Sequence, residues 1–193
     1  MLKIIHRVNK IEELRKIPVK YGVEVDIRTH NNKLILNHEP FENGDLLEEY
    51  LGEFNHAFII LEIKEEGIEE KVLKLCEKFR IENYFLLSVT VPFLYMLSEK
   101  GIRKMAVRFS EFESINTVLN FKDKVDWVWI DTFTKNPLAK EIYEQLKGLK
   151  ICFVCPDRWG RKEDIQRYKN NFEEEDIKLD AVMTSVVELW EER

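Results

Sequence analysis

Short apolar runs alternate with amphipathic stretches from one end of this 193-residue chain to the other. Each run has the length and the β-branched or aromatic content of a buried strand, whereas each stretch repeats apolar residues every three or four positions, as helices do. Strict alternation of strand and helix is typical of parallel sheets, because a parallel connection must cross the sheet and usually does so as a helix. The pattern therefore predicts an α/β protein.

Eight strand–helix units can be counted along the chain. The predicted strands are Leu2 to His6, Tyr21 to Ile27, Ala57 to Lys64, Tyr84 to Val89, Lys104 to Phe109, Asp126 to Asp131, Lys150 to Val154 and Asp180 to Thr184. The predicted helices are Asn9 to Ile17, Asp45 to Phe54, Gly67 to Phe79, Val91 to Lys100, Ser114 to Asn120, Leu138 to Lys147, Arg161 to Glu175 and Val186 to Trp190. Eight such units at this length predict a small closed (β/α)₈ TIM barrel.

A doubly wound open sheet is the competing fold. Such sheets usually carry a Gly-rich first turn that binds phosphate, and this chain has only seven glycines and no G-x-G-x-x-G motif. No Pro-, Gly- or Ser-rich linker interrupts the series of units either. We therefore expect residues 1–193 to form a single barrel domain.

Composition excludes several functional classes. The net charge of −6 and the lack of a basic cluster argue against nucleic-acid binding. No apolar segment reaches the roughly 18 residues that a membrane span needs, and the N-terminus is too short for a signal peptide. The cysteines, Cys76, Cys152 and Cys155, are odd in number, which favours a reduced, cytoplasmic setting. Cys152-x-x-Cys155 lies inside an apolar run, so we expect core packing rather than a redox or zinc motif.

The second predicted strand carries two acidic residues on one face. In YGVEVDIR, apolar residues alternate with Glu24 and Asp26, and successive strand side chains point to opposite faces. Two like charges side by side are unfavourable unless a cation or a proton lies between them. The next strand repeats the alternation in Glu62-x-Lys64. Three carboxylates on adjacent strands predict an oxygen-rich site for one hard divalent cation, such as Mg²⁺ or Ca²⁺.

Basic side chains and imidazoles accompany this predicted metal site. Catalytic groups of (β/α)₈ barrels lie at the C-terminal ends of strands, where this chain places His6-Arg7 and Lys64, with His38 following the second strand. A divalent ion together with Arg7 and Lys64 would outweigh the three carboxylates by one charge, which favours an anion such as a phosphate ester. Arg7 can hold two phosphate oxygens and Lys64 one. His6 and His38 would then supply one general base and one general acid.

These residues resemble the motifs of the glycerophosphodiester phosphodiesterases, which share their barrel with the phosphatidylinositol phospholipases C. The family pattern is His-Arg-Gly, Glu-x-Asp, His-Asp and Glu-x-Lys, and this chain has His6-Arg7-Val8, Glu24-Val25-Asp26, His38-Glu39 and Glu62-Ile63-Lys64.

The resemblance assigns a role to each of these residues. It implies that Glu24, Asp26 and Glu62 bind the metal, that His6 and His38 form the acid–base pair, and that Arg7 and Lys64 contact phosphate. Lys64 would also stabilise charge that develops on the phosphoryl oxygens. The implied activity is that of a metal-dependent hydrolase in lipid metabolism, which converts a small glycerophosphodiester-like substrate to an alcohol and a phosphomonoester.

The chain departs from the family pattern at several points, of which the insertion and the seventh strand end are those where the alcohol would be recognised. Val8 replaces a glycine, Glu39 replaces an aspartate, and the insertion after the second strand is reduced to Pro40 to Ala57. The segment VCPDRWGR replaces the family's seventh strand end. The resemblance therefore leaves the alcohol open, and Arg108, Arg158 and Trp159 are our candidates for contacts with the substrate.

Two other functional classes are compatible with the same residues. A divalent-metal barrel aldolase or isomerase would share the cation but would not hydrolyse phosphodiesters. A non-catalytic barrel that binds a phosphate ligand would be expected to have lost a metal ligand or a histidine, and this chain keeps them all. Among the remaining residues, His30 and His56 are expected in exposed loops, and Trp129 in the barrel core or at its mouth.

Overall fold

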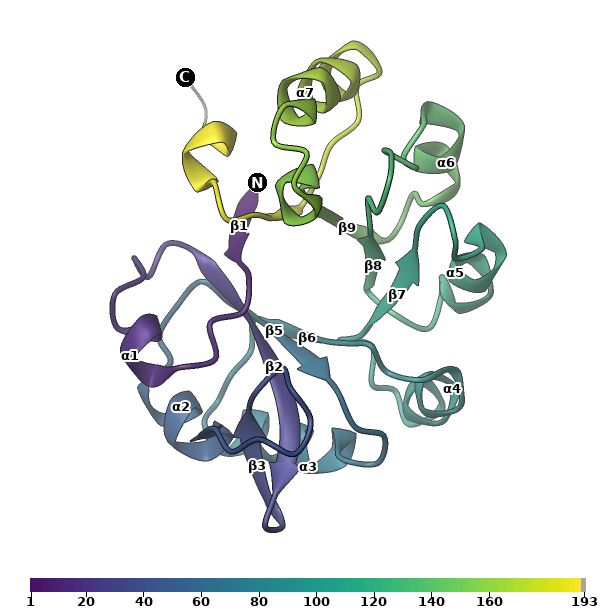
Figure 1. The fold of residues 1–193 in the computed structure, drawn as a ribbon. Helices are drawn as coiled ribbons and strands as arrows, with labels where there is room; N and C mark the ends of the chain where they lie inside the picture. The colour runs from purple at the N-terminus through teal and green to yellow at the C-terminus, as the bar shows by residue number, and fades with distance from the viewer. Residues whose placement is uncertain (192–193) are drawn as a thin grey trace.

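The structure is a computed structural model that describes residues 1–191, which form a mixed α/β fold of ten strands (Figure 1). The strands are β1 (Leu2–Ile5), β2 (Gly22–His30), β3 (Lys33–Leu36), β4 (Asp45–Leu46), β5 (Phe58–Ile63), β6 (Tyr84–Leu87), β7 (Ala106–Phe109), β8 (Trp127–Ile130), β9 (Lys150–Val154) and β10 (Ala181–Met183). The helices are α1 (Ile11–Leu14), α2 (Leu47–Glu53), α3 (Glu69–Lys78), α4 (Val91–Glu99), α5 (Ile115–Phe121), α6 (Lys140–Gln145) and α7 (Asp164–Glu174), with 3₁₀ turns η1 (Pro156–Trp159) and η2 (Val187–Trp190).

Eight of these strands run parallel and follow one another in chain order. Strand β1 pairs with β2, β2 with β5 and β5 with β6, while β7, β8, β9 and β10 pair in turn and β10 returns to β1. No continuous ladder joins β6 to β7 within residues 1–191. A single parallel bridge links Leu86 to Met105 there, and the Leu86 N–H donates to the Lys104 carbonyl at 2.9 Å. The α/β class predicted from the alternation is thus confirmed.

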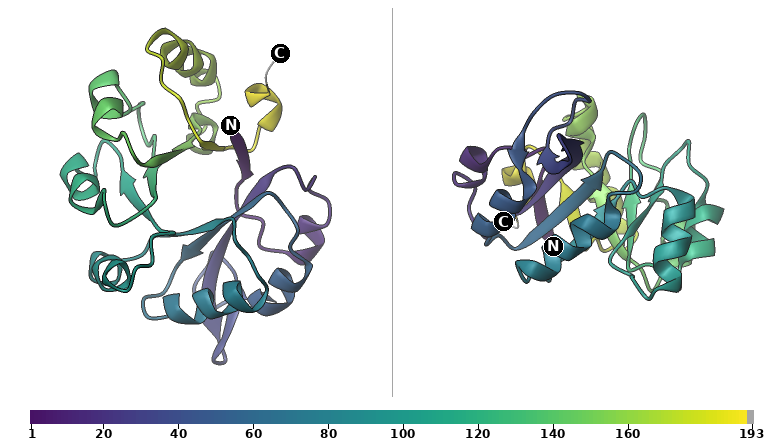
Figure 2. Two further views of the ribbon diagram at one scale, coloured as in Figure 1. Left: turned by 180° about the vertical axis from the view of Figure 1, so that it is seen from behind. Right: turned by 90° about the horizontal axis from the view of Figure 1, so that it is seen from below.

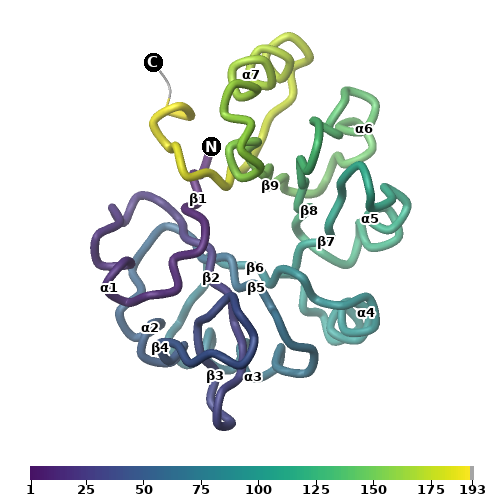
Figure 3. The backbone as a smooth tube through the Cα atoms, in the orientation of Figure 1, coloured from purple at the N-terminus to yellow at the C-terminus, as the bar shows by residue number. Residues whose placement is uncertain are grey.

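Helices α3 to α7 lie outside the strands, as Figure 2 shows in two further views and Figure 3 shows as a backbone tube in the orientation of Figure 1. The outer apolar layer fills the space between strands and helices and takes up outward residues such as Val25 and Leu61. A separate inner layer is built from strand side chains: Ile4, Ile60, Phe85, Leu87, Ala106, Trp127, Trp129, Cys152, Val154, Ala181 and Met183. Along β5 to β10, apolar residues alternate between the two layers, as the two-residue period requires.

All three cysteines are free and buried. Cys152 belongs to the inner layer, whereas Cys76 and Cys155 belong to the outer one. The prediction that Cys152-x-x-Cys155 is core packing is therefore confirmed. No helix within residues 1–191 combines the length and the apolar character needed to cross a bilayer.

A hairpin follows β2 and returns the chain to the strand ends. Strand β2 turns through Asn31 and Asn32, which have positive φ angles of 49° and 62°, and β3 pairs antiparallel with it (Figure 1). Asparagine tolerates this left-handed backbone, which suits the twist of a two-residue hairpin. After β3, the Asn37 N–H donates to the Asp26 carbonyl at 3.0 Å, which fixes the chain next to His38.

Three elements differ in length or type from the sequence predictions. Helix α1 spans only Ile11–Leu14: its first N–H, that of Ile11, donates to Asp45 Oδ2 at 2.7 Å, and the chain then turns toward Pro18. Asp45 and Leu46 were predicted to be helical, but they form β4, which pairs with β3. The closing helix is a 3₁₀ turn, Val187–Trp190. Residues 192–193 of the expected single domain lie outside the described residues.

Candidate active site

The inner face of β2 changes from apolar to acidic along the strand. Its inward residues pair in register with those of β5, namely Gly22 with Phe58, Glu24 with Ile60 and Asp26 with Glu62. At Gly22 a Cβ would lie 2.3 Å from Ile4 Cδ1 and 3.0 Å from the Phe58 carbonyl oxygen, so any side chain there would force the buried Ile4 to move. The apolar inner layer thus fills the space beside the N-terminal part of β2. The three carboxylates converge toward the C-terminal ends of β2 and β5.

Glu24, Asp26 and Glu62 are brought together as predicted. Carboxylate oxygens of the three residues lie within 4.8 Å of one another, and Glu24 and Asp26 are each only 1% exposed. Glu24 Oε2 accepts a 2.7 Å hydrogen bond from the Arg7 N–H, but within residues 1–191 its buried Oε1 has no partner. Burial, together with the charges of Asp26 and Glu62, raises the pKa of Glu24 well above its usual range. An orphaned oxygen in an all-oxygen cluster fits a hard cation such as Mg²⁺ or Ca²⁺.

Lys64 bridges two of these carboxylates. Its Nζ lies 3.0 Å from Asp26 Oδ1 and 2.8 Å from Glu62 Oε2. Burial alone would raise the pKa of Glu62, but the Lys64 ammonium and the Ser88 hydroxyl outweigh it and lower that pKa to about 2. Burial likewise would lower the pKa of Lys64, yet Glu62 and Asp26 raise it. A raised pKa disfavours the neutral amine that an aldolase lysine needs.

Asn9 orients Asp26, a role that the sequence did not reveal. Its Nδ2 donates to Asp26 Oδ2 at 2.7 Å, and its Oδ1 accepts from the Asp26 N–H at 2.8 Å. The chain reaches this position through Arg7, whose φ of 56° is left-handed and points its N–H at Glu24. Arg7 Nε lies 3.7 Å from Asp26 Oδ2. Asparagine favours helix starts, which is why Asn9 is easily interpreted as a helix cap.

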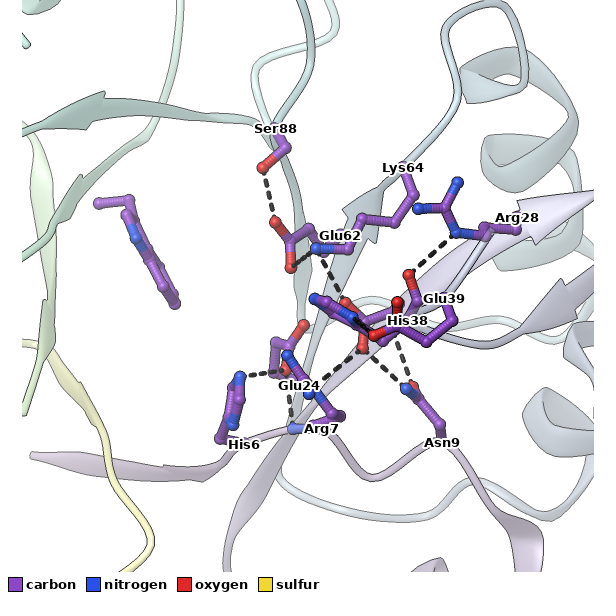
Figure 4. A network of polar contacts seen from close by, with 12 residues as sticks. His6, Arg7, Asn9, Glu24, Arg28, His38, Glu39, Glu62, Lys64 and Ser88 are labelled. Atoms are coloured by element: carbon purple, nitrogen blue, oxygen red, sulfur yellow. Dashed lines mark hydrogen bonds and ion pairs between the residues drawn. The ribbon is translucent and has the colours of Figure 1, made fainter. Parts of the chain in front are cut away.

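His6 follows β1 and faces the carboxylates. Its Nε2 lies 3.7 Å from Glu24 Oε2 (Figure 4). Burial, reinforced by the positive charges of Arg158 and Arg7, lowers the pKa of His6 to about 4. The imidazole is therefore neutral near pH 7 and able to accept a proton.

His38 comes from the loop after β3 and lines the same cavity as His6. Its Nδ1 lies 2.6 Å from Glu39 Oε1, and its carbonyl accepts a 3.1 Å hydrogen bond from Arg28 Nε (Figure 4). The ionised Glu39, whose pKa is lowered by this hydrogen bond, favours a proton on Nδ1. Glu39 is thus the hydrogen-bond partner of the His38 ring.

One cavity of about 220 Å³ collects these side chains. Of the residues predicted from sequence, nine line it: His6, Arg7, Glu24, His38, Glu62, Lys64, Arg108, Arg158 and Trp159. The tenth, Asp26, lies behind Lys64 and contacts it directly. Trp129 is buried in the inner layer and also lines the cavity floor.

Asp131 forms the opposite wall and was not among the predicted site residues. It is buried, and it accepts hydrogen bonds from Arg108 Nη2 at 2.6 Å, Trp129 Nε1 at 3.1 Å and Trp159 Nε1 at 3.2 Å. Burial raises the pKa of Asp131, although the charge of Arg108 opposes the effect. Its position at the end of a predicted strand was the one sequence feature that pointed to this role.

Comparison with solved structures relates the fold to phosphodiesterases. A glycerophosphodiester phosphodiesterase from Agrobacterium tumefaciens has a TM-score of 0.65 at 14% identity, over 95% of this chain and 96% of that one. A glycerophosphoryl diester phosphodiesterase from Parabacteroides distasonis has a TM-score of 0.63 at 13% identity, over 94% of this chain and 81% of that one. A provisionally assigned A. tumefaciens enzyme of the same name has a TM-score of 0.66 at 14% identity, over 95% and 93%.

These three structures show that the chain has the fold of proteins named as phosphoric diester hydrolases. No protein-family model matches the sequence, and a search of curated proteins finds no match. The likeness that these comparisons show is therefore one of fold.

Proposed function

We propose that this protein is a metal-dependent phosphodiesterase that hydrolyses a small glycerophosphodiester-like substrate to an alcohol and a phosphomonoester. The observation that carries the proposal is the convergence of Glu24, Asp26 and Glu62 with two imidazoles and Lys64, all of which except Asp26 line one cavity. Phosphoryl transfer needs little else from a protein, since positioning and charge stabilisation provide most of the catalysis. The shared fold with three glycerophosphoryl diester phosphodiesterases supports it.

We further infer that the eight parallel strands close into a (β/α)₈ barrel of the phospholipase C-like phosphodiesterase type, with residues 1–193 as one domain. The bridge between Leu86 and Met105 supports closure, as does an inner layer built from strands all around the ring. In such a barrel the cavity lies at the C-terminal mouth, where (β/α)₈ enzymes carry their active sites. The free cysteines support a reducing, cytoplasmic setting.

Glu24, Asp26 and Glu62 would hold one divalent cation, Mg²⁺ or Ca²⁺. When bound, such a cation supplies Lewis-acid stabilisation of negative charge on phosphoryl oxygens. Asn9 keeps the Asp26 carboxylate oriented toward the site through its paired hydrogen bonds. Arg7 and Lys64 contribute the cationic donors that hold the remaining phosphate oxygens.

The two histidines divide the proton transfers. Neutral His6 accepts the proton of a substrate hydroxyl adjacent to the ester carbon, and the hydroxyl oxygen forms a new bond to phosphorus. The bond from phosphorus to the leaving oxygen breaks, and protonated His38, held by Glu39, gives that oxygen its proton. The product is a cyclic phosphate, which water opens to the phosphomonoester. An internal nucleophile removes the entropy cost of a bimolecular attack.

A metal-supplemented screen against a panel of phosphodiesters tests this function. We expect hydrolysis of a glycerophosphodiester with Mg²⁺ or Ca²⁺, and calorimetric titration should show one cation site that Asp26→Ala abolishes. Unchanged cation binding in that variant would refute the ligand assignment. Turnover of a sugar phosphate by carbon–carbon cleavage or isomerisation, with every phosphodiester inert, would instead favour the aldolase or isomerase class.

A further inference from the structure

Three aromatic side chains form a row that begins at the cavity, where Trp159 is a lining residue. Phe112 follows β7, Phe133 follows β8 and Trp159 ends η1 after β9, so three successive strand–helix loops contribute one ring each. The ring centroids lie 5.9 Å apart between Phe112 and Phe133 and 4.7 Å apart between Phe133 and Trp159. These three residues are named the aromatic row below.

The aromatic row presents apolar surface to solvent. Phe112 is 75% exposed and Trp159 is 38% exposed. Single exposed apolar residues are ordinary, but contiguous rings beside a cavity are typical of a binding surface. Phe133 covers only part of the ring surface of Phe112 and Trp159, and much of the rest faces solvent.

Trp159 joins the row to the active-site cavity. Its Nε1 donates to Asp131 Oδ1 at 3.2 Å, and the other oxygen of Asp131 accepts from Arg108. The guanidinium of Arg158 lies 5.2 Å from the centroid of the indole ring, at cation–π distance. Trp159 is thus fixed by polar contacts inside the cavity while its ring packs against Phe133 outside it.

The geometry of the rings favours a flexible hydrocarbon over a flat aromatic group. The planes of successive rings are tilted by 53° and 48°, so no continuous flat face is available for stacking. One side of the indole is already covered by Arg158. A hydrocarbon chain follows such a broken surface by rotating about its single bonds.

We propose that the aromatic row binds an apolar chain carried by the leaving alcohol, so that the preferred substrates are amphiphilic phosphodiesters. The inference rests on the proposed phosphodiesterase function and adds the class of the alcohol to it. The phosphate lies at the carboxylate cluster, and the leaving chain extends past Trp159 and Phe133 toward Phe112.

A homologous series of glycerophosphodiesters tests the proposal, with alkyl leaving groups from methyl to decyl. Full burial of a methylene changes an equilibrium roughly 4-fold, and a row that covers one side of the chain should give about 2-fold per methylene. We expect kcat/KM to rise by that factor per methylene until the chain passes Phe112. Phe112→Ser and Phe133→Ser should each flatten the rise. Tyr95→Ser, which removes an exposed ring on α4 away from the row, should leave it intact.

The factor by which kcat/KM rises per methylene is determined within each variant, so any general loss of activity cancels. A flat series in the wild-type protein, with the methyl ester hydrolysed, would overturn the inference and leave the proposed function standing. If no ester is hydrolysed, the proposed function fails. Calorimetric titration with methyl to decyl phosphate then tests the inference separately, because the affinity should rise about 2-fold per methylene. If Phe112→Ser abolishes sedimentation with phosphatidylglycerol vesicles while the slope is unchanged, the row contacts membranes and the proposal is wrong.

Discussion

Asn9→Ala removes the two hydrogen bonds that orient the Asp26 carboxylate. The bond from Asn9 Nδ2 to Asp26 Oδ2 is 2.7 Å long, buried and charge-assisted, a kind worth about 1.5–3 kcal/mol. The second bond, from the Asp26 N–H to Asn9 Oδ1 at 2.8 Å, is worth about 1 kcal/mol as a neutral pair. We therefore expect the free energy of unfolding to fall by about 2.5–4 kcal/mol.

The same substitution should weaken cation binding. Residues that orient a metal ligand typically change metal affinity 10–100-fold, so we expect the Kd for Mg²⁺ or Mn²⁺ to rise by roughly that factor. Urea unfolding followed by circular dichroism measures the first effect, and calorimetric titration of the folded variant measures the second. Asn116→Ala, at an exposed position of α5, is the matched control and should change neither. A Kd that stays at the wild-type value in Asn9→Ala would refute the idea that Asn9 positions a metal ligand.

Three further predictions follow from other parts of the molecule. His6→Ala and His38→Ala should each lower kcat by roughly 10²–10⁴-fold, and the double variant should be little worse, because the two residues act as a unit; additive losses in steady-state kinetics would contradict this. Tyr50→Phe should raise the free energy of unfolding by about 1–3 kcal/mol, because the buried Tyr50 hydroxyl has no partner within residues 1–191; a lower urea midpoint would disagree. Burial raises the pKa of Cys76 and Cys155 to about 12, so a thiol reagent should label the protein only after unfolding, and rapid labelling of the native protein would count against the buried positions.

Local patterns predicted the class of fold and the core of the site. Apolar runs of strand length fix which segments become parallel strands, and a strand's two-residue period places Glu24 and Asp26 on one face whatever surrounds them. The pairing of β2 with β5 then follows from chain order, which brings Glu62 beside Asp26. These features depend on few residues close together in sequence, so sequence alone suffices to predict them.

Contacts between distant segments were beyond such reasoning. Asn9 looks like a helix cap, and its partner Asp26 lies 17 residues away. Asp131 ends a predicted strand, as several other residues do. What sets it apart is its hydrogen bond from Trp159, which lies 28 residues later in the chain. His56 was expected to be exposed, but this expectation was wrong. The residue is 8% exposed because its Nε2 donates to the Ile17 carbonyl, 39 residues earlier.

Phosphorus NMR of a glycerophosphodiester incubated with the protein and Mg²⁺ or Ca²⁺ tests the central claim most directly. We expect the diester resonance to decay through a transient cyclic phosphate to a phosphomonoester, and an analogue without the adjacent hydroxyl to be inert. Asp26→Ala should abolish the conversion of the true substrate. A diester resonance that stays unchanged both with Mg²⁺ and with Ca²⁺ would contradict the phosphodiesterase assignment. Cleavage of the analogue at a comparable rate would show that water attacks phosphorus directly.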